Sequence, residues 1–167
     1  MAKPTITQTY LHSILNYDPV SGAFTWRVRK AFRTIIGAKA GRVTKLGYCV
    51  ILIDRRNYMA HRLAWLYVHG NWPNQKLDHI DRDKQNNAIS NLREATQAQN
   101  CYNRKRAINS TSGFKGVTYR RSSGKWNAQI GCAGKRFNLG LYDTPEAAHQ
   151  AYCDAAKHFH GDFYCAG

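Results

Sequence analysis

One polar segment, residues 77–103, lies between two stretches with regularly spaced apolar residues, and this division constrains the fold more than any other feature. The segment is rich in Asp and Asn and includes His79, so it supplies few side chains for a hydrophobic core. A chain of 167 residues can instead form two small cores, one on each side of it. Its hydrophobic content of 43% is sufficient for packed cores and excludes global disorder. We therefore predict an α+β protein with two domains.

The first half of the chain carries short helix and strand patterns separated by turn residues. The strongest is an amphipathic helix that begins at Ala60, has apolar residues at i, i+3, i+4, i+7 and i+8, and ends near Gly70. Asp18 to Gly22 forms a turn cluster. The other expected elements are a helical stripe over residues 10–16, strands over 23–28 and 47–53, and a hairpin turn over 54–57.

The second half predicts three strands followed by one helix. The strands cover about residues 114–120, 125–132 and 135–142, with Trp126 and Phe137 in the core. Thr144 is the expected N-cap of the helix, Pro145 its first residue, and Gly161 its end. Its buried stripe is expected to contain Ala148, Ala151, Tyr152, Ala155 and Phe159.

A basic run followed by small polar residues separates the halves. We assign residues 1–106 to the first domain, 107–113 to a linker and 114–167 to the second domain. A linker of this kind predicts separable domains.

The chain carries a formal net charge of +15, which indicates a polyanionic partner and above all nucleic acid. The alternative is a merely soluble basic surface. Residues 1–106 hold 18 Lys/Arg against 6 Asp/Glu, whereas residues 107–167 hold 7 against 4. A DNA-binding second half would therefore depend on individually placed side chains rather than on bulk charge.

The five cysteines include no C-x-x-C pair, which argues against a disulfide framework and against a structural zinc site. No apolar run reaches the roughly 20 residues of a membrane span, and the N-terminus lacks the apolar stretch of a signal peptide. We therefore expect a cytoplasmic protein with reduced thiols and no membrane association.

The polar segment has the chemistry that phosphodiester cleavage needs. Histidine titrates near neutral pH and can take a proton from water. A hard divalent cation, bound by carboxylate and amide oxygens, can neutralise charge on the leaving oxygen. Adjacent Asp78 and His79 offer an oxygen ligand and a base. An isolated Asp-His pair is most often a surface turn, and only its ordered surroundings favour a site.

Those surroundings are D-H-I-D at 78–81, N-N-x-I-x-N-L-R at 86–93 and A-T-x-x-x-N at 95–100. In this order they resemble the Asp-His…Asn…Asn version of the HNH nuclease family, found in phage homing and free-standing endonucleases. The resemblance covers about residues 10–104 and implies a ββα-metal fold, with a β-rich stretch before the cassette at 77–103.

The resemblance also implies residue roles. Asp78 and Asn100 would be metal ligands, His79 the general base, and Asn91 a support for the loop and for the His79 ring. The metal would be Mg²⁺ or Mn²⁺, since Asn100 stands where many members have histidine. Arg93 could equally contact a phosphate or form a structural hydrogen bond, and Asn86 and Asn87 receive no role.

The second half carries G-F-K-G-V at 113–117, G-K-W-x-A-x-I at 124–130 and L-G-x-Y-x-T-x-E-A-A at 139–148. These motifs resemble the plant APETALA-two/ethylene-response-factor domain over residues 112–163, which implies a three-stranded antiparallel sheet that is packed on one helix and binds the DNA major groove. Long polar side chains on the outer face would meet bases and phosphates. The candidates are Lys115, Thr118, Arg120, Arg121, Lys125, Asn127, Gln129, Lys135, Arg136 and Asn138.

The expected function is a metal-dependent DNA endonuclease acting at an extended double-stranded site, as a monomer or weak dimer without an obligate protein partner. Nicking and double-strand cutting both stay open. The alternative is a non-catalytic, sequence-specific DNA-binding regulator, and an RNA-binding protein is a weaker third reading because the A-form major groove is too narrow for the sheet. Residues 1–106 alone are expected to retain some metal-dependent nicking.

Outside the cassette, His61 is expected to be buried and hydrogen-bonded, and His158 and His160 are expected to lie on the surface.

Overall fold

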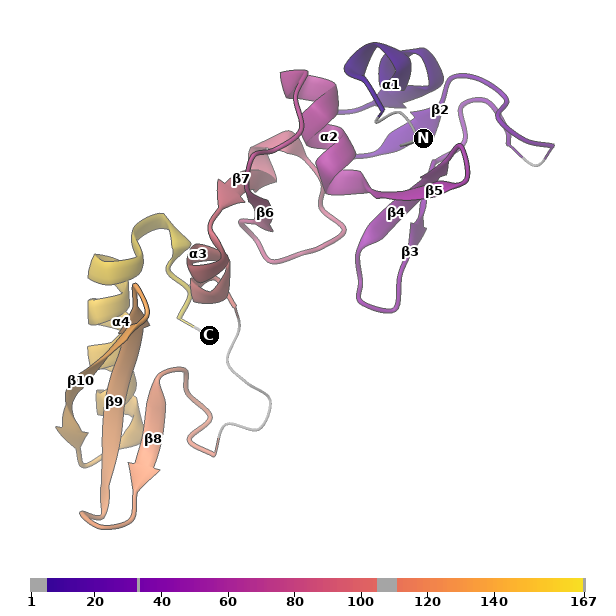
Figure 1. Cartoon of the computed structure of the whole chain (residues 1–167). Helices are drawn as coiled ribbons and strands as arrows, with labels where there is room; N and C mark the ends of the chain where they lie inside the picture. Colours follow the sequence, from indigo (N-terminus) through magenta and orange to yellow (C-terminus); the bar gives the residue numbers. More distant parts are fainter. Residues whose placement is uncertain (1–5, 33, 105–110, 167) are drawn as a thin grey trace. The chain divides into compact units, whose positions relative to one another are not determined.

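The computed structural model describes residues 6–32, 34–104 and 111–166, which group into two compact units of residues 1–94 and 95–167 (Figure 1). Helices and small sheets occur in both units, so the expected mixture of helix and strand is confirmed. The proposed boundaries at 106 and 113 stay predictions, and residues 107–110 of the proposed linker lie outside the described residues.

The first unit begins with a helix and a pair of short strands. α1 (Gln8–Ile14) leads directly into β1 (Leu15–Tyr17), which pairs with β2 (Phe24–Trp26) in antiparallel register. Three further strands form a second antiparallel sheet, namely β3 (Arg42–Val43), β4 (Cys49–Ile53) and β5 (Arg56–Met59). Helix α2 (Ala60–His69) follows, and then β6 (Lys76–His79), the 3₁₀ turn η1 (Ile89–Asn91) and β7 (Leu92–Ala95). β6 and β7 form their own two-stranded sheet.

The predicted hairpin between β4 and β5 is confirmed. Ile53 pairs with Arg56, which leaves a two-residue loop. Asp54 and Arg55 both have positive φ, 47° and 64°, as a type I′ turn requires. Lys30 forms an ion pair with Asp54 at 2.7 Å.

The predicted helix at residues 60–69 is also confirmed, and it provides much of the first core. It ends at Gly70, whose φ of +78° provides a left-handed C-cap. Leu63 and Leu66 on this helix are fully buried against Leu11 of α1 and Ile51 of β4.

In the described part of the second unit, a short helix is followed by a three-stranded sheet and a long helix. α3 (Gln97–Tyr102) is followed by β8 (Val117–Arg120), β9 (Lys125–Cys132) and β10 (Lys135–Tyr142), which form an antiparallel sheet in the order β10-β9-β8. α4 (Pro145–His160) covers one face of this sheet and continues into η2 (Gly161–Phe163) (Figure 1).

The expected signals of α4 are confirmed: the hydroxyl of Thr144 accepts a hydrogen bond from Ala147 N at 3.2 Å, and Pro145 is the first helical residue. β8 is shorter than expected because Gly116, at φ +76°, makes a turn against Tyr152. A Cβ at Gly116 would lie 2.1 Å from the Tyr152 ring.

Three expectations about the second core are wrong. Phe159 and Phe137 are 40% and 39% exposed and stack on each other, with ring centroids 5.3 Å apart. His160 is instead buried, stacks on Tyr102 and lies 2.9 Å from the carbonyl of Gly131. The buried residues Ala148, Tyr152, Ala156 and His160 follow one another at steps of four, so the buried stripe turns slowly around α4 and ends at His160. Phe159 lies at the edge of this stripe.

Within the part of the chain that the structure describes, no helix has the length and apolar character that crossing a membrane requires.

Candidate functional site

Strand β6 places Asp78 and His79 next to each other at its end, and both are buried. Asp78 is 5% and His79 6% exposed. Burial lowers the pKa of His79, and the hydrogen bond that the ring makes to Asn87 opposes this only in part. The imidazole is therefore favoured in its neutral form, which is the form that can accept a proton.

The ring of His79 is oriented by Asn87. Its Nε2 lies 3.3 Å from Asn87 Oδ1, while Asn87 Nδ2 donates to Gln85 O at 3.0 Å. The second bond fixes the amide with its oxygen toward the ring. An oxygen acceptor requires Nε2 to carry the hydrogen, which makes Nδ1 the unprotonated nitrogen of the neutral ring.

Asn87 is in turn held by the turn at residues 18–22. Tyr17 Oη donates to Asn87 O at 2.7 Å, and Ile89 N donates to Pro19 O at 3.3 Å. Burial raises the pKa of Tyr17 to about 12. Gly22 packs so closely that a Cβ there would lie 2.2 Å from Ala88 N. A segment some 70 residues upstream therefore sets the position of the His79 partner.

Asp78 forms an ion pair with Arg93 of β7. Both Nε and Nη2 of Arg93 donate to Asp78 Oδ2, at 3.0 and 2.9 Å. The side chains of Arg93 and Asp78 are 17% and 6% exposed, so little solvent screens the pair. The sequence left two roles open for Arg93, a phosphate contact or a structural hydrogen bond, and the structure shows the structural hydrogen bond.

Asn91 closes the loop between β6 and β7. Its Oδ1 accepts from Asp81 N at 3.0 Å, and its Nδ2 donates to Asp81 Oδ1 and to Asn86 O, both at 2.9 Å. The side-chain contacts of Asn91 are therefore with the loop, while the amide beside the His79 ring belongs to Asn87. The neighbouring Asn86-Asn87 pair was visible in the sequence, but local pattern did not show which amide faces the ring.

A second histidine lies against the ring of His79. The His61 ring is 5.1 Å from it, edge to face, and Tyr48 lies 5.7 Å from His61. The predicted burial of His61 is confirmed, but its Nδ1 has no hydrogen-bond partner within the described residues. Burial, with the nearby His79, lowers the pKa of His61 to about 4.

Asn100, the other expected metal ligand, lies on α3 in the second unit. The helix starts with a capping box in which Thr96 and Gln99 bond to each other's backbone. The structure thus brings Asp78, His79 and Asn91 together in one unit, and the approach of Asn100 to them stays a prediction. Among the described residues, no three His, Cys, Asp or Glu side chains gather to hold a metal ion.

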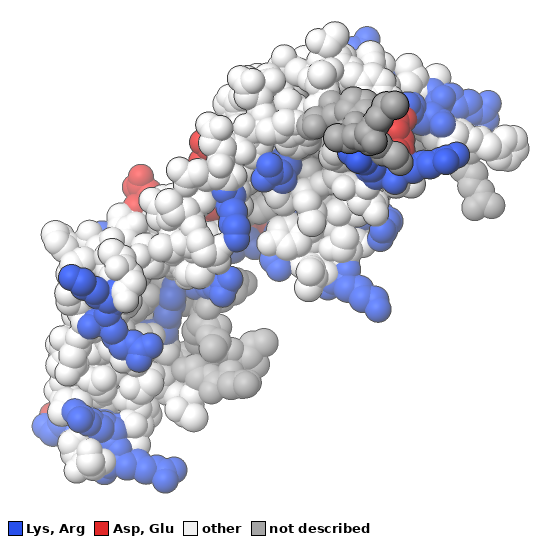
Figure 2. Space-filling view, viewed as in Figure 1, with Lys and Arg blue, Asp and Glu red and all other residues white. Residues whose placement is uncertain are grey.

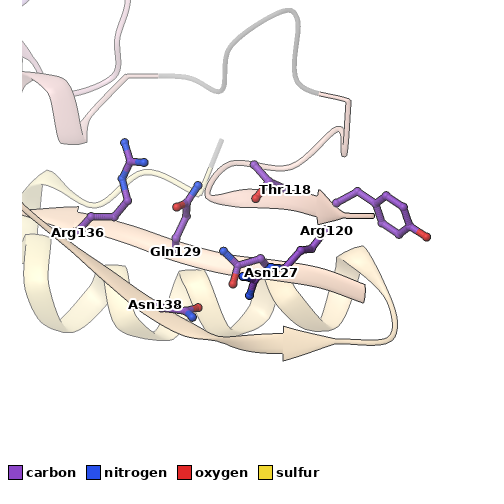
Figure 3. Close-up of a pocket in the computed structure, with 7 residues that line it drawn as sticks. Thr118, Arg120, Asn127, Gln129, Arg136 and Asn138 are labelled. Carbon is purple, nitrogen blue, oxygen red and sulfur yellow. The ribbon is translucent and has the colours of Figure 1, made fainter. Parts of the chain in front are cut away.

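The second unit has an open, polar hollow on the outer face of its sheet, with a volume of about 460 Å³. Figure 3 shows side chains from all three strands projecting on this side, with α4 behind the sheet. The lining residues are Thr118, Tyr119, Arg120, Asn127, Gln129, Arg136 and Asn138. Six of them are among the expected DNA-binding residues. On the face seen in Figure 2, Lys and Arg side chains outnumber Asp and Glu on both units.

The other four candidates lie outside this hollow. Arg121 is exposed in the turn after β8, and Lys135 is exposed at the start of β10. Lys125 forms an exposed ion pair with Asp143 at 3.0 Å. Lys115 Nζ donates to three backbone carbonyls, those of Tyr102, Arg104 and Cys165, at 2.7, 2.7 and 3.1 Å. These contacts give Lys115 a structural function that local sequence pattern did not indicate.

Comparisons with known proteins agree with this division. The family model described as HNH endonuclease matches residues 58–102, and the model described as AP2 domain matches residues 112–161. No solved structure matches the chain.

Individual relatives cover different shares of the chain. Protein 3.8 of Escherichia phage T7 is 31% identical over 62% of this chain and 85% of its own length. The uncharacterized HNH endonuclease L560 of Acanthamoeba polyphaga mimivirus is 34% identical over 71% of this chain, which spans 62% of that protein. The AP2-like ethylene-responsive transcription factor TOE2 of Arabidopsis thaliana is 43% identical over 30% of this chain and 10% of its own length. The chain therefore belongs to the HNH endonuclease family, and an AP2 domain follows its HNH domain.

Proposed function

We propose that this protein hydrolyses phosphodiester bonds of double-stranded DNA with the help of a divalent metal ion, and that its AP2 domain holds the duplex. The observation that carries the proposal is the buried His79, whose pKa is lowered and whose Nε2 is bonded to Asn87. This arrangement supplies a neutral imidazole with Nδ1 as its basic nitrogen near pH 7.

In this mechanism His79 acts as general base. Nδ1 takes a proton from the water that attacks phosphorus, and the hydrogen bond to Asn87 Oδ1 stabilises the positive charge that then forms on the ring. Asn87 keeps the ring from rotating, and Asn91 maintains the loop that carries Asn87. General-base help of this kind contributes roughly 10²–10⁴-fold to the rate.

The residues present fit a hard divalent cation. Asp78 offers carboxylate oxygen and Asn100 an amide oxygen, the ligand types that Mg²⁺ and Mn²⁺ prefer. When bound, the cation would stabilise negative charge on the leaving 3′ oxygen. We further propose that β6, β7 and α3, which follow one another in the chain, form the ββα-metal motif of the family.

Plasmid cleavage tests the proposal. Supercoiled DNA is incubated with the protein in Mg²⁺, in Mn²⁺ and in chelator, and the relaxed and linear products are separated. We expect product only with metal, and relaxed circles first, because one HNH domain supplies one active centre. His79→Ala should reduce cleavage by at least about 100-fold and leave binding in chelator unchanged.

The exposed His69 on α2 provides a control, since His69→Ala should cut like the unmodified protein. Undiminished cutting by His79→Ala would remove His79 from the mechanism. DNA binding without cleavage in either metal would favour the non-catalytic regulator.

A further inference from the structure

The outer face of the β10-β9-β8 sheet arranges its polar side chains by chemical type. Neighbouring strands bring residues into four rows: Arg136 with Gly131, Asn138 with Gln129, Thr118 with Asn127, and Arg120 with Lys125. By this register the arginines belong to the two end rows and the amides to the rows between them. Figure 3 shows Arg136 beyond Gln129 at one end of the face.

Two of the middle amides are not committed to bonds within the protein. The Oδ1 atom of Asn127 is shielded from solvent and has no hydrogen-bond partner among the described residues. Gln129 is half-buried in the lining of the hollow, and its side chain makes no hydrogen bond within the described ranges. Asn138 differs, because its Oδ1 accepts from Gly140 N at 3.2 Å at the bulge of β10. Gln129 can present both amide atoms to a ligand, since the terminal torsion of a free amide has a broad range. Asn127 must also turn at its first side-chain torsion to bring Oδ1 out of its shielded position.

The chemistry of a free amide selects among bases. It carries an acceptor and a donor side by side, and adenine shows the complementary N6 donor and N7 acceptor in the major groove. Guanine shows two acceptors there, O6 and N7, so the amide oxygen would face another oxygen. Two amides on one strand, with no arginine between them, therefore favour adenine over guanine.

We propose that Asn127 and Gln129 each read one adenine in the major groove, and that these two residues set the DNA sequence preference of this protein. The inference rests on one part of the proposed function, namely that the AP2 domain binds duplex DNA. Arg120 and Arg136 then provide the positive charge that holds the duplex at both ends of the face.

The strand geometry gives the spacing of the two adenines. Asn127 and Gln129 are two residues apart on β9, which separates them by about 6.6 Å along the strand. Successive bases rise by about 3.4 Å. When β9 follows the groove, the two contacted adenines lie about two base pairs apart.

The test uses the full chain in chelator, so that binding is measured without cleavage. Selection from a random duplex library should enrich sites with two A·T pairs at this spacing. Each adenine is then replaced by 7-deazaadenine, which lacks N7 and keeps Watson–Crick pairing. Each replacement should weaken binding roughly tenfold, as expected when a base contact is lost.

Variants assign the two contacts. Both Asn127→Ala and Gln129→Ala should bind the unmodified site less tightly. The affinity of Asn127→Ala should no longer change when 7-deazaadenine replaces one of the two adenines, and the affinity of Gln129→Ala should no longer change when it replaces the other. Gln150→Ala removes an exposed amide on α4, behind the sheet, and should behave like the unmodified protein. Equal binding of the normal and 7-deazaadenine duplexes by the unmodified protein would overturn the inference, as would enriched sites without paired adenines. Failure to bind any duplex would instead overturn the DNA-binding part of the proposed function.

Discussion

Arg93 binds Asp78 through two nitrogens on one carboxylate oxygen, with Nε at 3.0 Å and Nη2 at 2.9 Å from Oδ2. The pair joins β6 to β7 at the point where β6 delivers the expected catalytic residues. Because a buried carboxylate is costly without a partner, Arg93 makes it possible for Asp78 to lie there as an anion.

Replacing Arg93 should therefore destabilise the first unit. Arg93→Gln leaves the carboxylate of Asp78 buried without its cation, and we expect a loss of about 3 kcal/mol in the free energy of unfolding. Urea denaturation followed by tryptophan fluorescence measures this, since three of the four tryptophans lie in residues 1–94. Arg56→Gln removes an exposed arginine on β5 and should change stability by less than about 0.5 kcal/mol. Equal stability of the two variants would show that the ion pair does not support the fold.

Asn87 should act as a positioning residue for His79. Asn87→Ala removes the acceptor of the Nε2 hydrogen bond, and we expect roughly 10- to 100-fold slower cleavage. This hydrogen bond raises the pKa of His79, so its loss should move the acid limb of the pH–rate profile to lower pH. Asn87→Asp, which retains an acceptor and adds negative charge, should move that limb to higher pH. A profile that does not move in either variant would leave Asn87 with a purely structural role.

Gly22 should be indispensable because of what it touches. A Cβ at Gly22 would lie 2.2 Å from Ala88 N and 2.3 Å from the carbonyl carbon of Asn87. Gly22→Ala should displace the loop and reduce plasmid cleavage at least about tenfold, since a shift of this size misplaces the catalytic group. The AP2 unit should keep its affinity for duplex DNA.

Gly37→Ala is the matched control for Gly22→Ala. Gly37 also has positive φ, +83°, but a Cβ added there would meet no atom within 4 Å. Gly37→Ala therefore carries only the cost of placing alanine at positive φ, about 1 kcal/mol in the free energy of unfolding. It should cleave normally. Similar cleavage by both variants would exclude contact with the Asn87 loop as the reason for glycine at position 22.

His61 should make the first unit sensitive to acid. An unfolded histidine titrates near 6.5, whereas burial lowers the pKa of His61 to about 4. The unfolded chain therefore binds the proton first as pH falls. The contribution of neutral His61 to stability is complete above pH 6.5 and is lost progressively down to pH 4, about 3 kcal/mol in all.

His61→Phe tests this dependence, because phenylalanine keeps a ring but does not titrate. Between pH 7 and pH 5 its free energy of unfolding should fall less than that of the unmodified protein, in urea titrations at each pH. His69→Phe changes an exposed histidine and should leave the slope unaltered. An equal slope for His61→Phe would mean that His61 does not titrate as its burial implies.

Deletion of residues 107–167 should abolish metal-dependent cleavage. The sequence suggested that residues 1–106 would still nick DNA, but α3, with Asn100, packs within the second unit. Tyr102 of α3 stacks on His160 at 3.8 Å, and its hydroxyl accepts a hydrogen bond from Ala133 N at 3.0 Å. A helix of six residues is not stable without packing partners.

A single substitution distinguishes the effect of unpacking α3 from the effect of losing the DNA-binding sheet. Tyr102→Ala removes the stacking partner of His160 and keeps the whole sheet face, so it should reduce cleavage while leaving affinity for duplex DNA in chelator within about twofold. Metal-dependent nicking by residues 1–106 alone would show that α3 folds without the second unit.

Local signals in the sequence determined the elements of this protein. The Thr144 cap, Pro145 and Gly161 define α4, and the apolar spacing from Ala60 to Gly70 defines α2, since caps and periodicity act within a few residues. The polar cassette likewise identified Asp78 and His79 as neighbours, because they are adjacent in the chain.

Only the tertiary structure decided the partners of these residues. Asn87 rather than Asn91 faces the His79 ring, Arg93 binds Asp78, and Lys115 bonds to three backbone carbonyls instead of projecting from the sheet. The burial of His160 and the exposure of Phe159 depend in the same way on how α4 lies on the sheet. The physical reason is that each contact joins segments brought together by packing, and packing depends on the shapes of whole cores, which no short stretch of sequence encodes.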